Sequence, residues 1–237
     1  MTSTRHIQAV TFDVGGTLIE PWPSVGHVYA QVAQQHGFKN AHPEILNRQF
    51  AAAWKGKREF DHSRMAWLGL VEKTFAGVLD VPIDPEFFDE LYRRFAQPSA
   101  WRIFDDARPT LEWLREQGFR LGVISNWDER LRPLLERMRL SPFFENIVVS
   151  REVGFAKPSA KIFQKALECF DLPPHLVLHV GDSLAEDLEG AQTAGMQSLL
   201  LDRDERGSRT PALQSLSELQ GLLERERLKD SGRELGP

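Results

Sequence analysis

The spacing of hydrophobic residues changes twice along the chain. A largely apolar run from Ile7 to Phe12 predicts a short buried strand. From Ser24 to Phe95, apolar residues recur every three or four positions, which predicts amphipathic helices. After Trp101, short apolar runs alternate with helical segments. The pattern therefore predicts a helical stretch placed between a first strand and a longer region of alternating strands and helices.

The helical stretch contains four consecutive amphipathic segments joined by short polar connections. Pro43 and Pro85 suit the first turn of a helix, and Gly37 suits the end of one. Four such segments predict a small helical bundle, and we place Trp54 and Trp67 in its core. The helices are expected at residues 25–36, 43–54, 65–79 and 85–95.

The region after Trp101 supplies most of the predicted strands. Alternation of apolar strands with helices is typical of a parallel, doubly wound sheet that is covered on both faces. We therefore predict an α/β fold with a Rossmann-like parallel sheet of about five strands. Residues 1–21 and 102–237 are expected to form this core domain, and residues 22–101 a small inserted helical domain. The later strands are expected at residues 120–125, 147–150, 176–180 and 198–201, with helices at 106–116, 130–138, 159–170 and 184–194 and a last amphipathic piece at 213–223.

Composition and charge argue against several classes of protein. With 41% hydrophobic and 27% charged residues, the chain is typical of a globular protein. A formal net charge of −5 without a basic block argues against a nucleic-acid partner. No apolar run is long enough to cross a bilayer, and residues 1–9 lack the apolar core of a signal peptide, so we expect no membrane contact and a cytoplasmic location. The single cysteine, Cys169, fits a reducing compartment, and its place in an apolar helical pattern predicts that it is buried.

Polar residues stand at the ends of three predicted strands. Asp13 directly follows the first strand, and Ser125 and Asp182 end two of the others. In a doubly wound sheet, ligands bind beyond the carboxyl ends of the strands, so we expect these three side chains to meet. Two glycines after Asp13 indicate a sharp turn or a close approach of the backbone. On this evidence alone, Asp13 either attacks a substrate, binds a metal, or merely caps the turn.

Four short motifs occur in an order that resembles a known family. Together they resemble the haloacid dehalogenase (HAD) superfamily, subfamily I, and the match extends from Ile7 to about Asp202. The helical insert between the first two motifs resembles the small helical cap of that subfamily. The stretch Pro23-Ser24-Val25-Gly26-x-x-Tyr29 further resembles the branch of haloacid dehalogenase-like hydrolase domain-containing protein 3. The motifs are Asp13-x-Gly-Gly-Thr17, Ser125-Asn126, Lys157-Pro158 and Gly181-Asp182-Ser183-x-x-x-Asp187.

The resemblance implies a phosphoryl-transfer site. Asp13 would be the nucleophile that forms an aspartyl-phosphate, which divides one difficult displacement into two easier ones. Lys157 would supply fixed positive charge beside the transferred group and the clustered carboxylates. The residues implied to bind the phosphate are Ser125, Asn126, Gly16 and Thr17.

The resemblance also implies a Mg²⁺ cofactor, which prefers hard oxygen ligands in near-octahedral geometry. Its implied ligands are the carboxylates of Asp13 and Asp182 and the backbone carbonyl of Gly15. Asp187 would orient Lys157 or a metal-bound water.

Three other polar residues near these motifs have structural interpretations. Ser183 and Glu186 have the spacing of a capping box, so we expect both to cap a helix. His179 lies in the middle of an apolar strand, and we expect it to be buried and hydrogen-bonded. No pair of histidines has the spacing of a zinc site.

Gly15 is the main departure from the family pattern. HAD phosphatases usually carry a second Asp at this position, which protonates the leaving group and later activates water. Gly15 can still offer its carbonyl to a metal, but it has no side chain that could transfer a proton. The resemblance therefore implies aspartyl transfer without the usual general acid and base.

Three functions remain open from the sequence. The first is a Mg²⁺-dependent phosphatase of small phosphorylated metabolites, of open catalytic strength, acting as a monomer or weak homodimer. The second is another HAD chemistry. A phosphonatase would use a lysine such as Lys55 or Lys57 as a Schiff base, whereas Gly15 and Asp182 argue against a dehalogenase. The third is a HAD fold retained as a binding or scaffold module with little or no turnover.

Overall fold

The computed structural model of the chain describes residues 6–57, 60–79, 81–203 and 210–233. The chain divides into two units. The first unit comprises Met1–Ile19, Ile103–Asn126 and Leu140–Pro237, and the second comprises Glu20–Arg102 and Trp127–Arg139. The domain boundaries expected from the sequence instead place residues 127–139 in the core domain, which corresponds to the first unit.

The first unit contains a parallel sheet of six strands in the order β5-β4-β1-β6-β7-β8. The α/β fold class is thus confirmed, and each of the five predicted strands is present. The sixth strand, β8, has only two residues and was not predicted. The strands are β1 (Ala9–Phe12), β4 (Arg120–Ser125), β5 (Asn146–Val149), β6 (Val177–Gly181), β7 (Gln197–Leu201) and β8 (Ala212–Leu213).

The register of the central strands aligns their carboxyl ends. Phe12 on β1 pairs with Val123 on β4 and with Val180 on β6. Asp13, Ser125 and Asp182 lie one or two residues beyond these partners, so they leave the sheet at the same edge. The chain runs from β1 to β4 and β5 and then returns to the other side of β1 as β6, so β1 and β6 border the switch in strand order, where ligands bind in such sheets.

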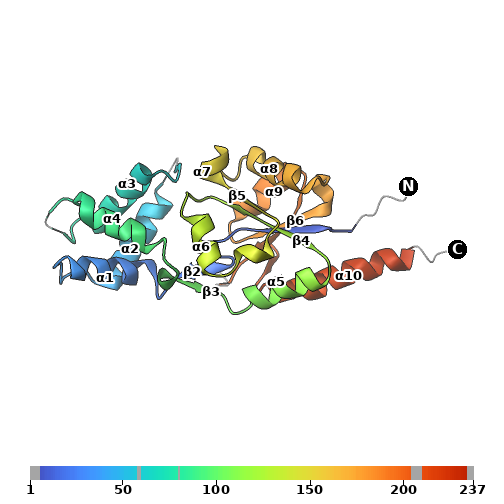
Figure 1. Cartoon of the computed structure of the whole chain (residues 1–237), viewed down its shortest axis with the longest axis horizontal. Helices are drawn as coiled ribbons and strands as arrows, with labels where there is room; N and C mark the ends of the chain where they lie inside the picture. Colours follow the sequence, from blue (N-terminus) through green and yellow to red (C-terminus); the bar gives the residue numbers. More distant parts are fainter. Residues whose placement is uncertain (1–5, 58–59, 80, 204–209, 234–237) are drawn as a thin grey trace. The chain divides into compact units, whose positions relative to one another are not determined.

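Helices cover both faces of this sheet, as Figure 1 shows. One face carries α5 (Ala107–Glu116) and α10 (Glu218–Arg233), and the other carries α7 (Ser150–Val153), α8 (Ala160–Phe170) and α9 (Gly190–Thr193). Burial on both faces explains why β1 and β6 are buried at every position and are largely apolar. None of the described helices combines the length and apolarity needed to span a bilayer.

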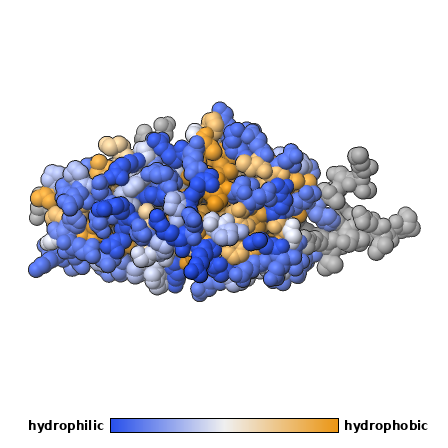
Figure 2. Space-filling view, in the orientation of Figure 1, coloured by the Kyte–Doolittle hydropathy of each residue, from blue (hydrophilic) through white to orange (hydrophobic). Residues whose placement is uncertain are grey.

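The second unit contains the four predicted helices. They are α1 (Val25–Gln35), α2 (Pro43–Lys55), α3 (Arg64–Phe75) and α4 (Pro85–Arg94), joined by α6 (Leu131–Arg137). Their core is rich in aromatic residues, such as Tyr29 stacked on Phe75 with ring centroids 5.5 Å apart. Trp54 and Trp67 are only partly buried, and they stack on each other. On the face shown in Figure 2, hydrophilic residues cover much of the described surface, as expected for amphipathic helices.

Three local features differ from the sequence-based expectation. Two short strands were not expected, namely β2 (Ile19–Pro21) and β3 (Trp101–Ile103), which pair in a two-stranded sheet. The helix expected at 184–194 begins as a π-helical turn, η4 (Leu184–Glu189), and continues as α9. The expected burial of Cys169 is wrong, because this residue lies outside the buried stripe of α8 and is exposed.

A buried ion pair fastens α6 to the other helices of the second unit. Asp128 is completely buried and forms two hydrogen bonds with the guanidinium of Arg130, at 2.8 and 2.6 Å. Asp128 also accepts a 2.7 Å hydrogen bond from the indole of Trp67 on α3. The Arg130 guanidinium lies 3.6 Å from the ring centroid of Tyr92 on α4 and donates to its carbonyl.

Asp128→Ala is expected to lower the free energy of unfolding by about 3–5 kcal/mol, because it leaves the Arg130 charge buried without its partner. Denaturant unfolding measures this loss. Lys165→Ala, which breaks an exposed pair with Glu168, is the control and should cause no measurable loss. Equal losses in the two variants would contradict the structural importance of the buried pair.

Asp106 at the start of α5 joins three segments of the first unit. It accepts two hydrogen bonds from Arg203, at 2.9 and 2.8 Å, and others from the Ser215 hydroxyl and the Leu216 N–H. Burial opposes the charge of Asp106, but these hydrogen bonds outweigh burial and hold the pKa of its carboxyl below the usual value.

A lowered pKa gives a stabilisation that is present above the ordinary Asp pKa of about 3.9 and is lost as the pH falls through the folded-state pKa. We expect the difference in free energy of unfolding between the wild type and Asp106→Asn to be largest near neutral pH and to shrink below about pH 4. Denaturant titrations of both proteins across this range measure it. A difference that stays constant on acidification would show that the Asp106 charge contributes nothing.

Candidate active site

Asp13 lies at the carboxyl end of β1, where it meets a lysine and a serine from distant parts of the chain. Its backbone N–H donates to the Val180 carbonyl at 2.9 Å, which extends the pairing of β1 with β6 by one residue. Its Oδ1 accepts a 3.0 Å hydrogen bond from the Ser125 hydroxyl and a 2.6 Å hydrogen bond from Lys157 Nζ. Both hydrogen bonds end on Oδ1, and Oδ2 takes part in neither of them. The side chain of Asp13 is therefore held in a fixed orientation.

Lys157 is buried between two carboxylates. Its Nζ contacts Asp13 Oδ1 at 2.6 Å and Asp187 Oδ1 at 2.5 Å, and only 4% of the residue is exposed. Burial alone would lower the pKa of the ammonium, but the negative charges of Asp13 and Asp187 outweigh it and raise the pKa well above its usual value. Lys157 thus remains a fixed positive charge and is not suited to act as a base.

Asn126 positions the backbone of Lys157. Its amide oxygen accepts the Lys157 N–H at 2.7 Å, and its amide nitrogen donates to the Lys157 carbonyl at 3.0 Å. The same nitrogen donates to Glu186 at 3.0 Å. The resemblance implied that Asn126 binds phosphate. In the structure, its side chain is hydrogen-bonded to the backbone of Lys157 and to Glu186 on η4.

Asp187 is fixed from several directions by η4 and β6. One oxygen contacts Lys157 and the Nε2 of His179 at 3.0 Å, and the other accepts the backbone N–H of Ser183 at 3.0 Å. Burial opposes ionisation, but Lys157 and His179 outweigh it and hold the pKa of Asp187 well below its usual value. The implied role of Asp187 in orienting Lys157 agrees with this geometry.

His179 is completely buried and hydrogen-bonded, which confirms its expected structural role. Because the ionised Asp187 carboxylate can only accept, Nε2 must donate to it. In the neutral ring, Nδ1 then accepts from the Thr11 hydroxyl, 2.9 Å away on the neighbouring strand β1. Thr11 thus supports the site through His179 and Asp187. The sequence pattern does not indicate this role, because Thr11 lies inside the largely apolar run of the first strand.

The structure confirms the capping role expected of Ser183. Its hydroxyl accepts the backbone N–H of Glu186 at 3.2 Å and so caps the turn. The Ser183 N–H donates to Asp187 at 3.0 Å. The Glu186 carboxylate instead accepts from Asn126.

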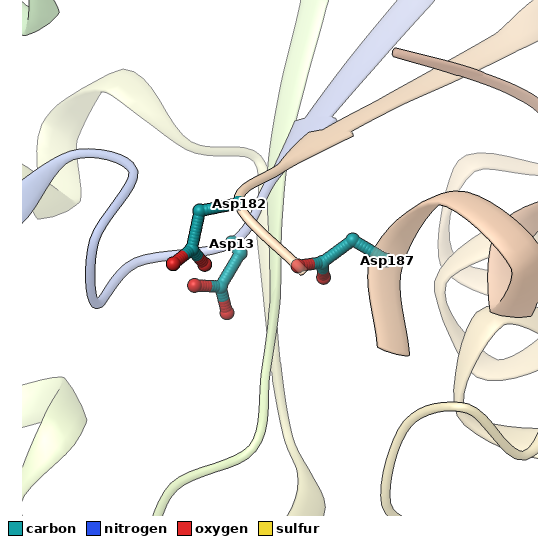
Figure 3. Close-up of side chains that lie close together, drawn as sticks. All are labelled: Asp13, Asp182 and Asp187. Atoms are coloured by element: carbon teal, nitrogen blue, oxygen red, sulfur yellow. The ribbon is translucent and has the colours of Figure 1, made fainter. Parts of the chain in front are cut away.

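Asp182 faces Asp13 across the close approach of two backbones. Figure 3 shows their carboxylates side by side, with Asp187 approaching from the adjacent helical turn. A Cβ atom added to Gly16 would lie 2.5 Å from Asp182 Oδ2, and Gly16 has a φ of +83°. Gly16 is therefore required both for its backbone angle and for the space that Asp182 occupies.

The other residues of the first motif differ in their exposure. Gly15 lies outside the positive-φ region and forms an isolated bridge with Ile19. Thr17 is completely buried, so its hydroxyl is not presented at the surface as the phosphate contact that the resemblance implies. Its carbonyl instead accepts a hydrogen bond from Arg203, a residue that the sequence did not indicate.

The carboxylates satisfy the requirements of a magnesium site. Oxygen atoms of Asp13, Asp182 and Asp187 lie within 4.8 Å of one another. Both oxygens of Asp187 are engaged, which leaves Asp13 and Asp182 as the available carboxylate ligands. Burial raises the pKa of Asp13. Although Asp182 is exposed to solvent, desolvation of its carboxyl and the charges of Asp13 and Asp187 raise its pKa to about 7. A divalent cation would relieve this repulsion, so the donor set fits Mg²⁺.

Comparison with known proteins identifies the class to which this fold and site belong. Residues 7–195 match the family model described as haloacid dehalogenase-like hydrolase. The crystal structure of a HAD phosphatase from Thermococcus onnurineus superposes with a TM-score of 0.67 at 26% identity and covers 92% of this chain and 98% of that one. The chain belongs to the haloacid dehalogenase-like hydrolase family.

Curated relatives place the chain near one branch of that family. It is 34% identical to human haloacid dehalogenase-like hydrolase domain-containing protein 3 over 212 residues, which cover 85% of this chain and 84% of the human protein. The Danio rerio protein of the same name is 34% identical over 236 residues, covering 92% of this chain and 97% of the relative. The resemblance to this branch that the sequence indicates is thus confirmed.

Mg²⁺ is expected to raise the melting temperature, because an ion that binds only the folded state stabilises it by mass action. At about 100 times its dissociation constant, this stabilisation is about 2.7 kcal/mol. Asp182→Ala should abolish the effect by removing a direct ligand. Thermal denaturation with and without Mg²⁺ measures it, and Glu168→Ala, which removes an exposed carboxylate on α8, is the control. An unchanged Mg²⁺ response in Asp182→Ala would locate the ion elsewhere.

Proposed function

We propose that this protein is a Mg²⁺-dependent phosphatase of small phosphorylated metabolites that acts through an aspartyl-phosphate on Asp13. The observation that carries the proposal is the arrangement around Asp13. Its Oδ1 is held by Ser125 and Lys157, and the carboxylate of Asp182 lies close beside it. Such a group of fixed cation, hydroxyl donor and paired carboxylates suits the spread negative charge of a phosphoryl group in transfer.

The metal would be held by Asp13, Asp182 and the backbone carbonyl of Gly15. When bound, Mg²⁺ supplies positive charge that neutralises phosphate oxygens and the clustered carboxylates. A magnesium-bound HAD-hydrolase from Bacillus subtilis, YfnB, superposes on this chain with a TM-score of 0.74 at 21% identity and covers 92% of this chain and 99% of that one. That likeness concerns the fold, whereas the carboxylates of this chain themselves favour metal binding.

The proposed reaction has two steps. In the first, an oxygen of Asp13 attacks phosphorus, the Asp13 O–P bond forms, and the bond from phosphorus to the leaving oxygen breaks with its electron pair on that oxygen. In the second, water attacks the phosphorus, the Asp13 O–P bond breaks with its electron pair returning to the carboxylate, and inorganic phosphate leaves with the oxygen of the water, whose proton stays on the phosphate or passes to solvent. Lys157 and Ser125, which contact Asp13 before the reaction, would stabilise the phosphoryl oxygens in both steps.

Gly15 determines which substrates this chemistry suits. Without a carboxyl at position 15, the side chain of that residue cannot protonate the leaving oxygen or deprotonate the attacking water. Lys157 does not replace it, because its ammonium is committed to Asp13 and Asp187 and its pKa is raised. Leaving groups that need no proton are therefore favoured.

Aryl and acyl phosphates are expected to turn over measurably, and alkyl phosphates such as sugar phosphates very little. A positioned general acid or base is typically worth ~10²–10⁴ in rate, and its absence is felt most with poorly acidic alcohols. Gly15→Asp should raise kcat/KM for alkyl phosphates, since residue 15 lies outside the glycine-favoured φ region. The measurement is the ratio of kcat/KM for an aryl phosphate to that for an alkyl phosphate in both proteins.

Asp13→Asn is the blank for these assays, because it keeps the size of the side chain but removes the nucleophilic carboxylate. Turnover that survives in Asp13→Asn would overturn the proposed mechanism. If the wild type hydrolyses alkyl and aryl phosphates equally well, another group supplies the proton, and the importance of Gly15 would be refuted.

Other HAD chemistries find less support in the residues available. A phosphonatase needs a buried lysine, but Lys55 is exposed, and the Nζ of Lys57 lies 3.2 Å from the ring centroid of Trp54. Solved dehalogenases share the fold, including one from Pseudomonas syringae with a TM-score of 0.65 at 24% identity, covering 92% of this chain and 99% of that one. Asp182 beside Asp13 favours a metal-dependent reaction instead.

A binding or scaffold role would be indicated by the failure of Asp13 to form an aspartyl-phosphate with a reactive donor.

The remaining parts of the proposal follow from composition and charge. The partner is a small phosphorylated molecule and not a nucleic acid or a membrane, because the net charge is −5 and no basic block is present in the sequence. We further propose a cytoplasmic monomer or weak homodimer.

A further inference from the structure

The turn that follows Asp13 carries much of the site, but its sequence gives it little rigidity. Gly15 and Gly16 lie within it, and glycine has the greatest backbone freedom of any residue. Inside the turn, the N–H groups of Leu18 and Ile19 donate to the Val14 carbonyl at 2.9 and 3.0 Å. Pairing with β6 fixes the upstream end at Asp13. The downstream carbonyls of Thr17 and Leu18 are bound by groups from other segments.

Arg203, two residues after β7, binds the downstream end of the turn. Its Nη2 donates to the Thr17 carbonyl at 2.8 Å. Nη1 and Nη2 also bind the two oxygens of Asp106, at 2.9 and 2.8 Å. The guanidinium therefore bridges the turn and the start of α5, which a planar group with several donors can do and a lysine cannot.

Neighbouring residues fix the guanidinium in this position. Its central carbon lies 3.8 Å from the ring centroid of Phe104, whose own N–H donates to the Leu18 carbonyl at 3.1 Å. Asp106 is in turn held by the Ser215 hydroxyl and the Leu216 N–H, at 2.7 and 2.9 Å. Segments far apart in the sequence thus converge on two adjacent carbonyls of the Asp13 turn.

We propose that Arg203 is a positioning residue that fixes the turn of residues 14–19 and, through it, the Gly15 carbonyl and the Asp13 carboxylate. The consequence for Mg²⁺ binding rests on the proposed function, whereas the effect on the turn does not. Groups that orient metal ligands through a neighbouring contact typically contribute 10–100-fold to metal affinity or activity. Nothing in the spacing of the motifs indicates Arg203, because the motif set ends at Asp187.

A second arginine of the first unit provides a matched control. Arg120, at the amino end of β4, forms two hydrogen bonds with Glu145, one of them at 2.7 Å, and donates to the Phe170 carbonyl at 2.7 Å. Its guanidinium lies 5.1 Å from the ring centroid of Phe170. Arg120 thus repeats the carboxylate, carbonyl and aromatic contacts of Arg203, but it lies at the opposite end of the strand from Ser125.

The experiment compares Arg203→Gln, Arg203→Lys and Arg120→Gln with the wild type. The first measurement is amide hydrogen exchange in metal-free protein. Arg203→Gln is expected to accelerate exchange at Leu18 and Ile19, whereas Arg120→Gln leaves these amides protected as in the wild type. Arg203→Lys should be intermediate, since an ammonium can bind one of the two partners but cannot span both. If Arg203→Gln fails to fold, the comparison of Arg203→Lys with the wild type still tests the proposal.

The second measurement is the Mg²⁺ dissociation constant, obtained from the dependence of the melting temperature on Mg²⁺ concentration. Arg203→Gln is expected to bind Mg²⁺ at least about tenfold more weakly than the wild type. Arg120→Gln should lose stability but keep its Mg²⁺ affinity.

Two outcomes would overturn the inference and leave the proposed function standing. One is wild-type protection of Leu18 and Ile19 in both Arg203 variants. The other is equal weakening of Mg²⁺ binding in Arg203→Gln and Arg120→Gln, which would indicate a general loss of stability. If wild-type protein shows no Mg²⁺ response, the proposed function fails, and hydrogen exchange alone still decides whether Arg203 fixes the turn.

Discussion

The ammonium of Lys157, placed between Asp13 and Asp187, is the interaction on which the rest of the site depends. Three carboxylates within 4.8 Å of one another would repel strongly without a cation among them. The lysine is buried, so its charge is weakly screened, and the Asn126 amide holds its backbone on both sides. The four motifs are separate in the sequence, but through this one ammonium they form a single electrostatic unit.

The support for this unit extends into the sheet. Asp187 is held by His179, which contacts Thr11 on the neighbouring strand, so the register of β1 and β6 determines where the carboxylate lies. The π-helical turn at Leu184–Glu189 brings the Asp187 side chain back toward the backbone of Ser183. Such turns often occur at functional sites. Here the irregular helix and the buried histidine both act to fix one carboxylate beside the lysine.

Much of the fold and part of the site could be predicted from the sequence. Strands buried on both faces produce continuous apolar runs, and Asp13, Ser125 and Asp182 end three of them. Contacts between distant segments could not be predicted this way. The roles of Asn126 and Arg203 arise only where loops converge, and the exposure of Cys169 depends on which side of α8 faces the sheet. Residues 127–139 group with the helical unit, which they contact through the buried Asp128–Arg130 pair, and this pair has no periodic signature.

Gly15 and Gly16 are neighbours, but only Gly16 has a backbone angle that requires glycine. Any side chain at position 16 would collide with Asp182 and would need a backbone angle that such residues rarely adopt. Position 15 has no such restriction on its backbone angle. A side chain at position 15 therefore needs no unusual backbone angle, whereas the adjacent position must remain glycine to keep the two carboxylates in place.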